Sequence, residues 1–201
     1  MIRVQGKLPR ELYVAVSGGV DSMAALNFLK GNHTVKAVLF FDHGTETSKD
    51  ASWLVKDACS WKEIPVKMGT ITRDRGRDES WEAYWRAERY HFLDQFTDAP
   101  VVTCHHLDDC VETWIFSSLH GQSKIIPYRR ENIVRPFRLN RKAEFINWTK
   151  RNKVAWHEDF SNEDTRYMRN FIRHELMPKA LVVNPGLHKV IARKIENEDF
   201  S

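Results

Sequence analysis

Several signals that would place a chain outside the reducing cytosol are missing from this sequence. No run of about 18 apolar residues is present, which predicts that no segment spans a membrane. The first ten residues, MIRVQGKLPR, lack the apolar core of a signal peptide. Only three cysteines occur, with no C-x-x-C pair, so the sequence indicates no disulfide framework. These absences predict a cytoplasmic protein, and they assign no role to the cysteines, Cys59, Cys104 and Cys110.

Two common nucleotide-binding motifs are also missing. The sequence contains neither the Walker loop G-x-x-x-x-G-K-[ST] nor the Rossmann fingerprint G-x-G-x-x-G. What is present is a chain of 201 residues, 42% hydrophobic and 29% charged, which is enough for one sizeable domain. The formal net charge of +4 is compatible with a nucleic-acid partner but does not require one.

The hydrophobic pattern predicts alternating strands and helices along the first two thirds of the chain. Expected strands are residues 12–16, 35–41, 65–71 and 101–103, and expected helices are 23–29, 48–61, 79–96 and 108–119, with Ser48 as an N-cap. This alternation is typical of a doubly wound α/β fold with a parallel sheet. Ligands bind such sheets at the carboxyl ends of the strands, so residues 17–22, 42–44 and 104–109 are expected to lie at one site.

The character of the chain changes after Gly121. Residues 122–136 are basic and are expected to be irregular, and helices are expected at 141–152, at 167–177 ending before Pro178, and weakly at 186–201. We therefore predict a domain over residues 1–125 and a small helical C-terminal extension over residues 126–201, packed on the same domain.

The stretch S-G-G-V-D-S is expected to form the turn from a buried strand into a helix. Paired glycines let backbone N–H groups approach an anion closely, and the helix N-terminus adds a favourable dipole. The serines can donate hydrogen bonds, and Asp21 could hold Mg²⁺. An alternative is that the serine and the aspartate only cap the helix. The candidate phosphate-binding residues are Ser17, Gly18, Gly19, Val20, Asp21 and Ser22.

The stretch C-H-H-L-D-D-C-V-E-T, residues 104–113, is a dense cluster of titratable groups. Asp109 and Glu112 are three residues apart, so on a helix they would share a face and present two carboxylates to a cationic substrate. A zinc site is disfavoured because no third soft ligand is suitably spaced. A helix N-cap with incidental histidines is the remaining alternative.

The stretch S-G-G-V-D-S resembles the pyrophosphate-binding loop of the PP-loop ATP pyrophosphatases, and five further stretches narrow the resemblance. F-D-H-G-T-E-T-S-K-D-A, E-A-Y-W-R-A-E-R-Y, C-H-H-L-D-D-C-V-E-T and the segment V-R-P-F-R-L-N-R-K-A-E-F resemble the N-terminal domain of tRNA(Ile)-lysidine synthetases. The fifth match is H-E-D-F-S-N-E-D-T-R-Y-M-R-N-F-I-R-H-E-L-M-P. The resemblance covers roughly residues 10–187.

This resemblance implies an enzyme that uses ATP and Mg²⁺ to adenylate a cytidine in the CAU anticodon of an isoleucine tRNA. Free L-lysine then displaces AMP. By matching positions, Asp21, Arg86, His105, Asp109 and Glu112 would be catalytic. Within this set Arg86 would stabilise the α-phosphate, and Asp109 and Glu112 would bind the lysine.

Several roles remain open at the level of sequence. Arg169, Asn170 and Arg173 could contact phosphate or tRNA, or could pair with Glu158, Asp159 or Asp164 to fasten the C-terminal helix. Arg86 could be an ordinary surface arginine, and His105 an ordinary hydrogen-bonded histidine. Trp81, Tyr84 and Trp85 could stack on a flipped base, although the sequence favours a place in the core, and Trp85 replaces the family's usual alanine.

The sequence also departs from the family pattern. Thr45 and Glu46 stand where the family has Leu-Arg, and His120 stands before Gly121 where it has Arg. Members of the family generally continue into C-terminal domains that grip tRNA, so a short form is expected, with dimerisation as a possible substitute. The alternatives to lysine ligation are thiolation of another RNA, a small-molecule substrate, or non-catalytic nucleotide binding.

Overall fold

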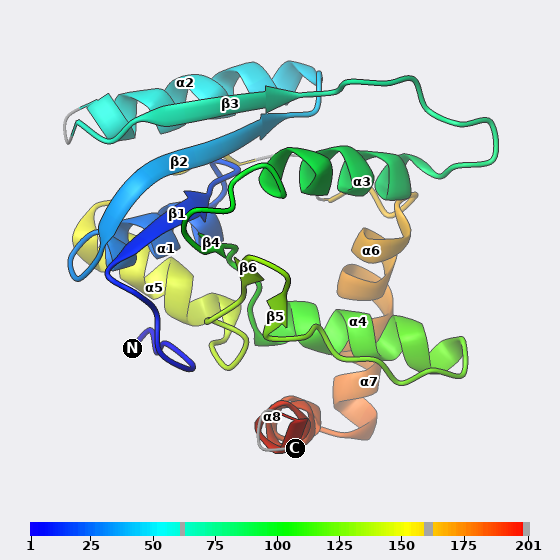
Figure 1. Ribbon diagram of the computed structural model, residues 1–201. Helices are drawn as coiled ribbons and strands as arrows, with labels where there is room; N and C mark the ends of the chain where they lie inside the picture. Colours follow the sequence, from blue (N-terminus) through cyan, green and yellow to red (C-terminus); the bar gives the residue numbers. More distant parts are fainter. Residues whose placement is uncertain (61–62, 159–162, 199–201) are drawn as a thin grey trace.

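The computed structural model describes residues 1–60, 63–158 and 163–198 (Figure 1). The strands are β1 (Glu11–Ala15), β2 (Thr34–Asp42), β3 (Val66–Thr70), β4 (Val101–Val102), β5 (Arg129–Arg130) and β6 (Ile133–Val134). The α-helices are α1 (Val20–Leu29), α2 (Glu46–Ser60), α3 (Trp81–Leu93), α4 (Leu107–Leu119), α5 (Lys142–Asn152), α6 (Met168–Phe171), α7 (Met177–Val183) and α8 (Leu187–Glu198). A π-helical turn, η2 (Ile172–Leu176), joins α6 to α7.

The described strands form one six-stranded sheet in the order β3-β2-β1-β4-β6-β5. Every neighbouring pair is parallel except β5 and β6, which are antiparallel. The strand order reverses direction beside β1, because the chain moves first to β2 and β3 and later to β4 on the other side. This reversal is the topological switch point at which doubly wound sheets bind ligands. The predicted fold class is confirmed.

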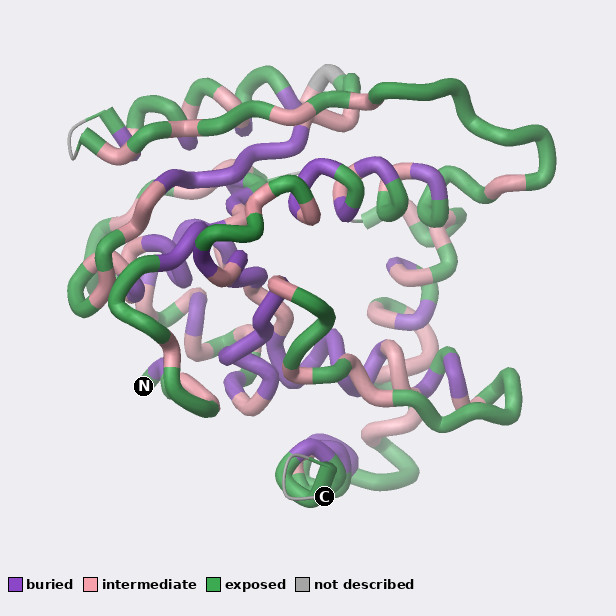
Figure 2. Tube along the Cα trace, viewed as in Figure 1, coloured by how far each residue is buried: buried purple, intermediate pink, exposed green. Residues whose placement is uncertain are grey.

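Side chains of the central strands alternate between two apolar layers. On β1, Leu12 and Val14 pack with α1, α2 and α5, whereas Tyr13 faces the layer covered by α3. On β2, Phe40 lies in the first layer and Phe41 in the second. Both faces are covered, which is why these strands read as near-continuous apolar runs in the sequence. Figure 2 shows the buried centre of β1 and β2.

A third apolar cluster holds the C-terminal helices. Val111 and Ile115 on α4 pack with Ile172 of η2 and with Ile191 and Ile195 of α8. Burial of such side chains contributes about 1.5–3 kcal/mol each, so this cluster fixes η2 and α8 against α4. Its consequence for the site is that residues of α6 and η2 are held beside the start of α4.

Three predictions about local structure were wrong. Residues 122–136 contribute β5 and β6 to the sheet, because Ile133 and Val134 are buried and pair with β4. The helical path does not end before Pro178, since a proline is tolerated in the first turn of α7. Ser48 is not an N-cap, because α2 begins at Glu46. Trp61 and residues 199–201, at the ends of two expected helices, lie outside the described residues.

The division at residue 125 stays a prediction, although the sheet and the packing of α5 on the first apolar layer both continue past it. Within the described part of the chain, no helix is long and apolar enough to cross a membrane.

Candidate active site

A cleft of about 740 Å³ opens at the carboxyl ends of β1 and β4. Its walls come from the loop after β1, the loop after β4, the C-terminal half of α3, one side of α5 and the segment leading into η2. The sequence predicted that the three loops after β1, β2 and β4 meet at one edge, and each contributes to this cleft. From the second loop, however, the lining residue is His43 rather than Asp42 or Gly44.

The loop after β1 leaves the start of α1 uncapped. Gly19 is the N-cap residue and makes no side-chain capping bond. Ser22 Oγ instead donates a hydrogen bond to Gly19 O at 2.9 Å and accepts one from Ser17 N at 3.2 Å. The capping alternative for these residues is therefore wrong. The loop is braced by its own serines, and the first backbone N–H groups of α1 have no capping side chain to satisfy them, as an anion site requires.

Gly18 is required by two separate features of this loop. Its φ is +86°, in the left-handed region that L-residues rarely adopt. A Cβ at this position would lie 3.0 Å from Ala51 Cβ. Its carbonyl oxygen also accepts a hydrogen bond from His157 N at 2.9 Å, which ties the loop to the segment after α5.

Asp21 lies at the floor of the cleft with one carboxylate oxygen unsatisfied. Oδ1 is buried and has no hydrogen-bond partner among the described residues, while Oδ2 is 3.6 Å from His106 Nε2. An orphaned carboxylate oxygen beside an uncapped helix start fits Mg²⁺, which typically uses one or two protein carboxylates together with phosphate oxygens and water. Among the described residues, no group of three or more His, Cys, Asp or Glu side chains gathers in a way that could hold a metal ion.

The two adjacent histidines have opposite electrostatic surroundings. Burial lowers the pKa of His105 well below its ordinary value despite the charge of Asp109, and Nδ1 shares a 3.0 Å hydrogen bond with Thr103 Oγ1. His106 is also buried, but the charges of Asp109 and Asp21 outweigh that burial and raise its pKa. His105 therefore contributes a neutral imidazole to the cleft, whereas His106 lies behind Asp21, beside carboxylates that favour its protonated form.

Asp109 has a structural role in addition to its place in the cleft. Its Oδ2 accepts a 2.9 Å hydrogen bond from His106 N, and His106 Nδ1 accepts one from Asp109 N, so the two form a capping box at the start of α4. Burial alone would raise the pKa of the Asp109 carboxyl, but the positive charges of His106 and Arg169 lower it to about 2. The carboxylate is ionised throughout the physiological range.

Arg169 and Arg173 pair with Asp109 and Glu112. Arg169 Nη2 lies 2.6 Å from Asp109 Oδ1, and its Nε lies 3.0 Å from Glu112 Oε2. Arg173 Nε donates to Glu112 Oε1 at 2.7 Å. Burial opposes the charge on Arg169, but the two carboxylates raise its pKa above the ordinary value. The expected shared face of Asp109 and Glu112 is confirmed, because a single guanidinium bridges both carboxylates.

Within the described residues, neither arginine pairs with Glu158 or Asp164, which were two of the three acidic partners that the sequence offered as an alternative. Glu158 lines the cleft, Asp164 pairs with Arg166, and Asp159 lies outside the described residues. Only Asn170 contacts an expected partner, since its Nδ2 donates to the carbonyl oxygen of Asp164 at 3.0 Å. Sequence spacing could not find the true partners, because they lie 57 to 61 positions away on another helix.

The positions of the arginines and carboxylates relative to the cleft determine which charge faces it. Arg169, Arg173 and Asp109 line it, whereas Glu112 is not among the described lining residues and its side chain is only 3% exposed. The side chain of Arg169 is 43% exposed. The guanidinium groups therefore lie in front and the carboxylates mostly behind, which is an arrangement suited to binding an anion.

Arg86, the arginine assigned to the α-phosphate, does not line the cleft. It is exposed, and its guanidinium lies 4.8 Å from the centre of the Tyr90 ring. Arg89, one helical turn later on α3, lines the cleft instead. Burial lowers the pKa of Arg89, and within the described residues it has no ion pair. Both arginines lie in the matched stretch E-A-Y-W-R-A-E-R-Y, so the motif could also have suggested Arg89. Only the packing of α3 shows which of the two faces the cleft.

The aromatic residues of α3 divide between core and rim. Tyr84 is 4% exposed, as expected for a core residue, but Trp81 is 50% exposed, so its expected place in the core is wrong. Trp85 is half-buried and lies near His43, with ring centroids 6.0 Å apart.

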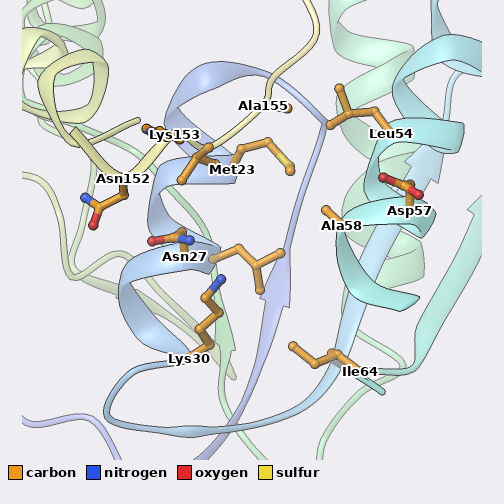
Figure 3. Close-up of a pocket in the computed structure, with 12 residues that line it drawn as sticks. Met23, Asn27, Lys30, Leu54, Asp57, Ala58, Ile64, Asn152, Lys153 and Ala155 are labelled. Carbon is orange, nitrogen blue, oxygen red and sulfur yellow. The ribbon is translucent and has the colours of Figure 1, made fainter. Parts of the chain in front are cut away.

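A second, smaller cavity of about 290 Å³ lies between α1, α2 and the end of α5 (Figure 3). Met23, Leu54 and Ile64 contribute apolar walls, and Lys30, Asp57 and Lys153 contribute charged groups. It shares no lining residue with the first cleft, and none of the residues assigned to the chemistry lies in it.

Comparison with known families fits this geometry. A family model described as the PP-loop domain matches residues 3–180. The chain belongs to the PP-loop domain family. Among curated PP-loop relatives, a tRNA(Ile)-lysidine synthase of Porphyromonas gingivalis is 34% identical over 94% of this chain and 44% of its own length. One from Thermosipho africanus is 32% identical over 92% of this chain and 47% of its own length. The chain thus spans about half the length of these relatives.

A solved structure of another protein shares the fold. It is the U34-tRNA thiolase NcsA from Methanococcus maripaludis with its [4Fe-4S] cluster, which superposes with a TM-score of 0.72 over 95% of this chain and 73% of that one. The sequence identity is 13%, so this likeness concerns the architecture alone.

Proposed function

We propose that this PP-loop chain uses ATP to activate a base of a tRNA and transfers L-lysine to that base. The observation that supports the proposal best is the juxtaposition in one cleft of an uncapped helix start, the orphaned Oδ1 of Asp21, and the Arg169–Asp109 pair. The names of the curated relatives supply the substrate class, because they are tRNA(Ile)-lysidine synthases.

In this proposal the β- and γ-phosphates of ATP bind the loop from Ser17 to Ser22. Asp21 would hold Mg²⁺, which would neutralise charge on the phosphate oxygens. Arg89 is better placed than Arg86 to stabilise the α-phosphate, because it faces the cleft, has no acidic partner among the described residues, and remains charged at neutral pH.

The first step forms a bond between the cytidine O2 and the α-phosphorus of ATP. The bond to the bridging oxygen breaks, and pyrophosphate leaves. In the second step the ε-amine of lysine attacks C2, the C2–O2 bond breaks, and AMP leaves with that oxygen. Asp109, one of the carboxylates that line the cleft, would hold the lysine ammonium (pKa about 10.4), which must lose a proton to water before the amine attacks.

The observed ion pairs refine the role of the two carboxylates. Each oxygen of Asp109 and Glu112 already has a partner, namely His106 N, Arg169 or Arg173. We therefore propose that Glu112 chiefly orients the two arginines, and that lysine shares Asp109 with Arg169. The arginines would then bind an anionic group, either a phosphate or the lysine carboxylate.

The cysteines do not support the thiolation alternative. Cys59 and Cys110 are buried in separate apolar clusters, and Cys104 is the only cysteine that lines the cleft among the described residues. Burial, with the charges of Asp21 and Asp109, raises the pKa of the Cys104 thiol well above its usual range. Iron–sulfur clusters and sulfur transfer use thiolates, and this site provides one isolated, protonated thiol.

The deciding experiment is incubation of the protein with total tRNA, ATP and radiolabelled lysine, followed by nucleoside mass spectrometry. Lysine-dependent appearance of lysidine would support the full proposal. ATP conversion to AMP with a different modified nucleoside would reject the lysine assignment. ATP binding without pyrophosphate release would indicate a non-catalytic relative.

A further inference from the structure

The start of α3 carries a group of aromatic rings at the surface. Trp81 is 50% exposed, and its ring lies 5.3 Å from that of Trp85 at an interplanar angle of 35°. Trp85 in turn lies 6.3 Å from Tyr167 at 42°. Single exposed apolar side chains are normal on protein surfaces, whereas apolar groups gathered at one place more often mark a binding site.

This group is continuous with the rim of the cleft. Trp85 lies next to His43, which lines the cleft. Tyr167 is the N-cap residue of α6, whose second residue, Arg169, also lines the cleft. A chain of nucleotides with one base inside the cleft would therefore leave an adjoining nucleotide beside these rings.

An arginine accompanies the exposed indole. The guanidinium of Arg75 lies 4.8 Å from the Trp81 ring centre, and within the described residues it makes hydrogen bonds only to the backbone oxygens of Gly76 and Glu79. Its charge helps lower the pKa of the Glu79 carboxyl, but that carboxylate is held in a bidentate pair by Arg73, and no ion pair of Arg75 is found among the described residues.

The loop that carries Arg75 is fixed rather than left to fold on binding. Arg73 and Glu79 form a bidentate pair with both N···O distances 2.8 Å, and Thr72 N and Oγ1 donate to Glu88 at 2.7 and 2.8 Å. Preorganisation of this kind lowers the entropic cost of ligand binding.

We propose that Trp81, supported by Trp85 and Arg75, is a stacking platform for an unpaired RNA base next to the base that enters the cleft. Aromatic faces stack on any base, and an arginine plane can either extend the stack or contact the adjoining phosphate. The inference rests on the proposed function in so far as the substrate is RNA. It adds a contact that the matched motifs do not assign, because the family's usual residue at position 85 is alanine.

The test measures binding of two fluorescein-labelled RNAs by anisotropy at one fixed salt concentration. One probe is an anticodon stem-loop with a CAU anticodon, and the other is single-stranded oligocytidylate. The variants are Trp81→Ala and Trp81→Phe, and the matched control is Trp53→Ala, because Trp53 is 70% exposed on α2 and does not line the cleft. Circular dichroism confirms that each variant is folded.

Loss of one base stack weakens binding by roughly five- to a hundredfold. We expect a loss of that size for both probes with Trp81→Ala, and near wild-type binding with Trp81→Phe and Trp53→Ala. Equal affinities of Trp81→Ala and wild type would overturn the platform, as would a wild type that binds neither probe. If both probes show the Trp81 dependence while no lysidine forms, the platform stands and the lysine-transfer proposal fails.

Discussion

Arg169 and Asp109, which are 60 positions apart in the chain, form a 2.6 Å ion pair at the wall of the cleft. The pair joins α6 to the first turn of α4, and Glu112 and Arg173 extend it to a network of four charges. Because the carboxylates are buried, removing the cations should cost more than a surface ion pair would. The same network sets where an incoming ammonium or phosphate can bind.

Arg169→Met should lower the free energy of unfolding by about 1–3 kcal/mol, because it leaves Asp109 without its main partner, although the arginine itself is partly exposed. Urea unfolding at pH 7 measures the change. Arg166→Met is the matched control, since Arg166 pairs with Asp164 at an exposed site and should change stability by less than about 0.5 kcal/mol. Equal effects of the two substitutions would show that the buried network adds nothing to stability.

Asp109→Asn should raise the lysine concentration needed for turnover by roughly tenfold or more, because a hydrogen bond to a charged group contributes about 1.5–3 kcal/mol. Pyrophosphate release in a single turnover with tRNA should continue. A variant that loses thermal stability but keeps its lysine dependence would show that Asp109 only caps α4.

Asp21→Ala should abolish conversion of ATP to AMP. The fold should lose less than about 1 kcal/mol, because the Asp21 side chain is partly exposed in the first turn of α1 and its contact with His106 is long, at 3.6 Å. The measurement is AMP formation by chromatography, with Asp57→Ala, on the second cavity, as the control. Wild-type AMP formation by the Asp21 variant would reject the assignment of this loop to pyrophosphate.

A comparison of Gly18→Ala with Gly121→Ala should separate the stability lost to backbone strain from the stability lost to a steric clash. Both glycines have positive φ, +86° and +75°, so each substitution should cost about 1–2 kcal/mol of backbone strain. Only at Gly18 would the new Cβ meet a neighbour, Ala51 Cβ at 3.0 Å, so we expect a larger loss of stability there and loss of ATP use. Thermal unfolding and AMP formation, measured on both variants, provide the comparison.

Arg89→Gln should slow adenylation at least tenfold, whereas Arg86→Gln should change it less than twofold, because only Arg89 lines the cleft. Single-turnover pyrophosphate release is the measurement. The reverse order of effects would restore the role that the sequence motif suggested for Arg86.

The imidazole of His105 should remain neutral at pH 6, because burial lowers its pKa well below the ordinary value. Nitrogen-15 chemical shifts of the ring can show this, with His106, whose pKa is raised, as the internal comparison. Below about pH 6.5 the unfolded chain binds a proton at His105 that the folded chain does not. His105 should therefore reduce the free energy of unfolding as the pH is lowered from 7 to 5, while His106 acts in the opposite direction, so the difference between wild type and His105→Asn across this range measures the His105 contribution.

Much of this molecule was predictable from the sequence because the signals are local. The apolar run before S-G-G-V-D-S and the alternation of strands and helices determined the parallel sheet and the edge at which its loops meet. The three-residue spacing of Asp109 and Glu112 determined that they share a face of α4. The matched motifs also predicted the family.

The tertiary structure alone decided the roles that depend on packing between distant segments. Arg169 and Arg173 pair with α4 because α6 and η2 are held there by the apolar cluster around Ile191, which no local spacing encodes. The face on which α3 packs against the sheet directs Arg89 into the cleft and leaves Arg86 on the surface. The same packing buries Tyr84 and exposes Trp81, because a helix packed on one side must leave some of its large side chains in solvent.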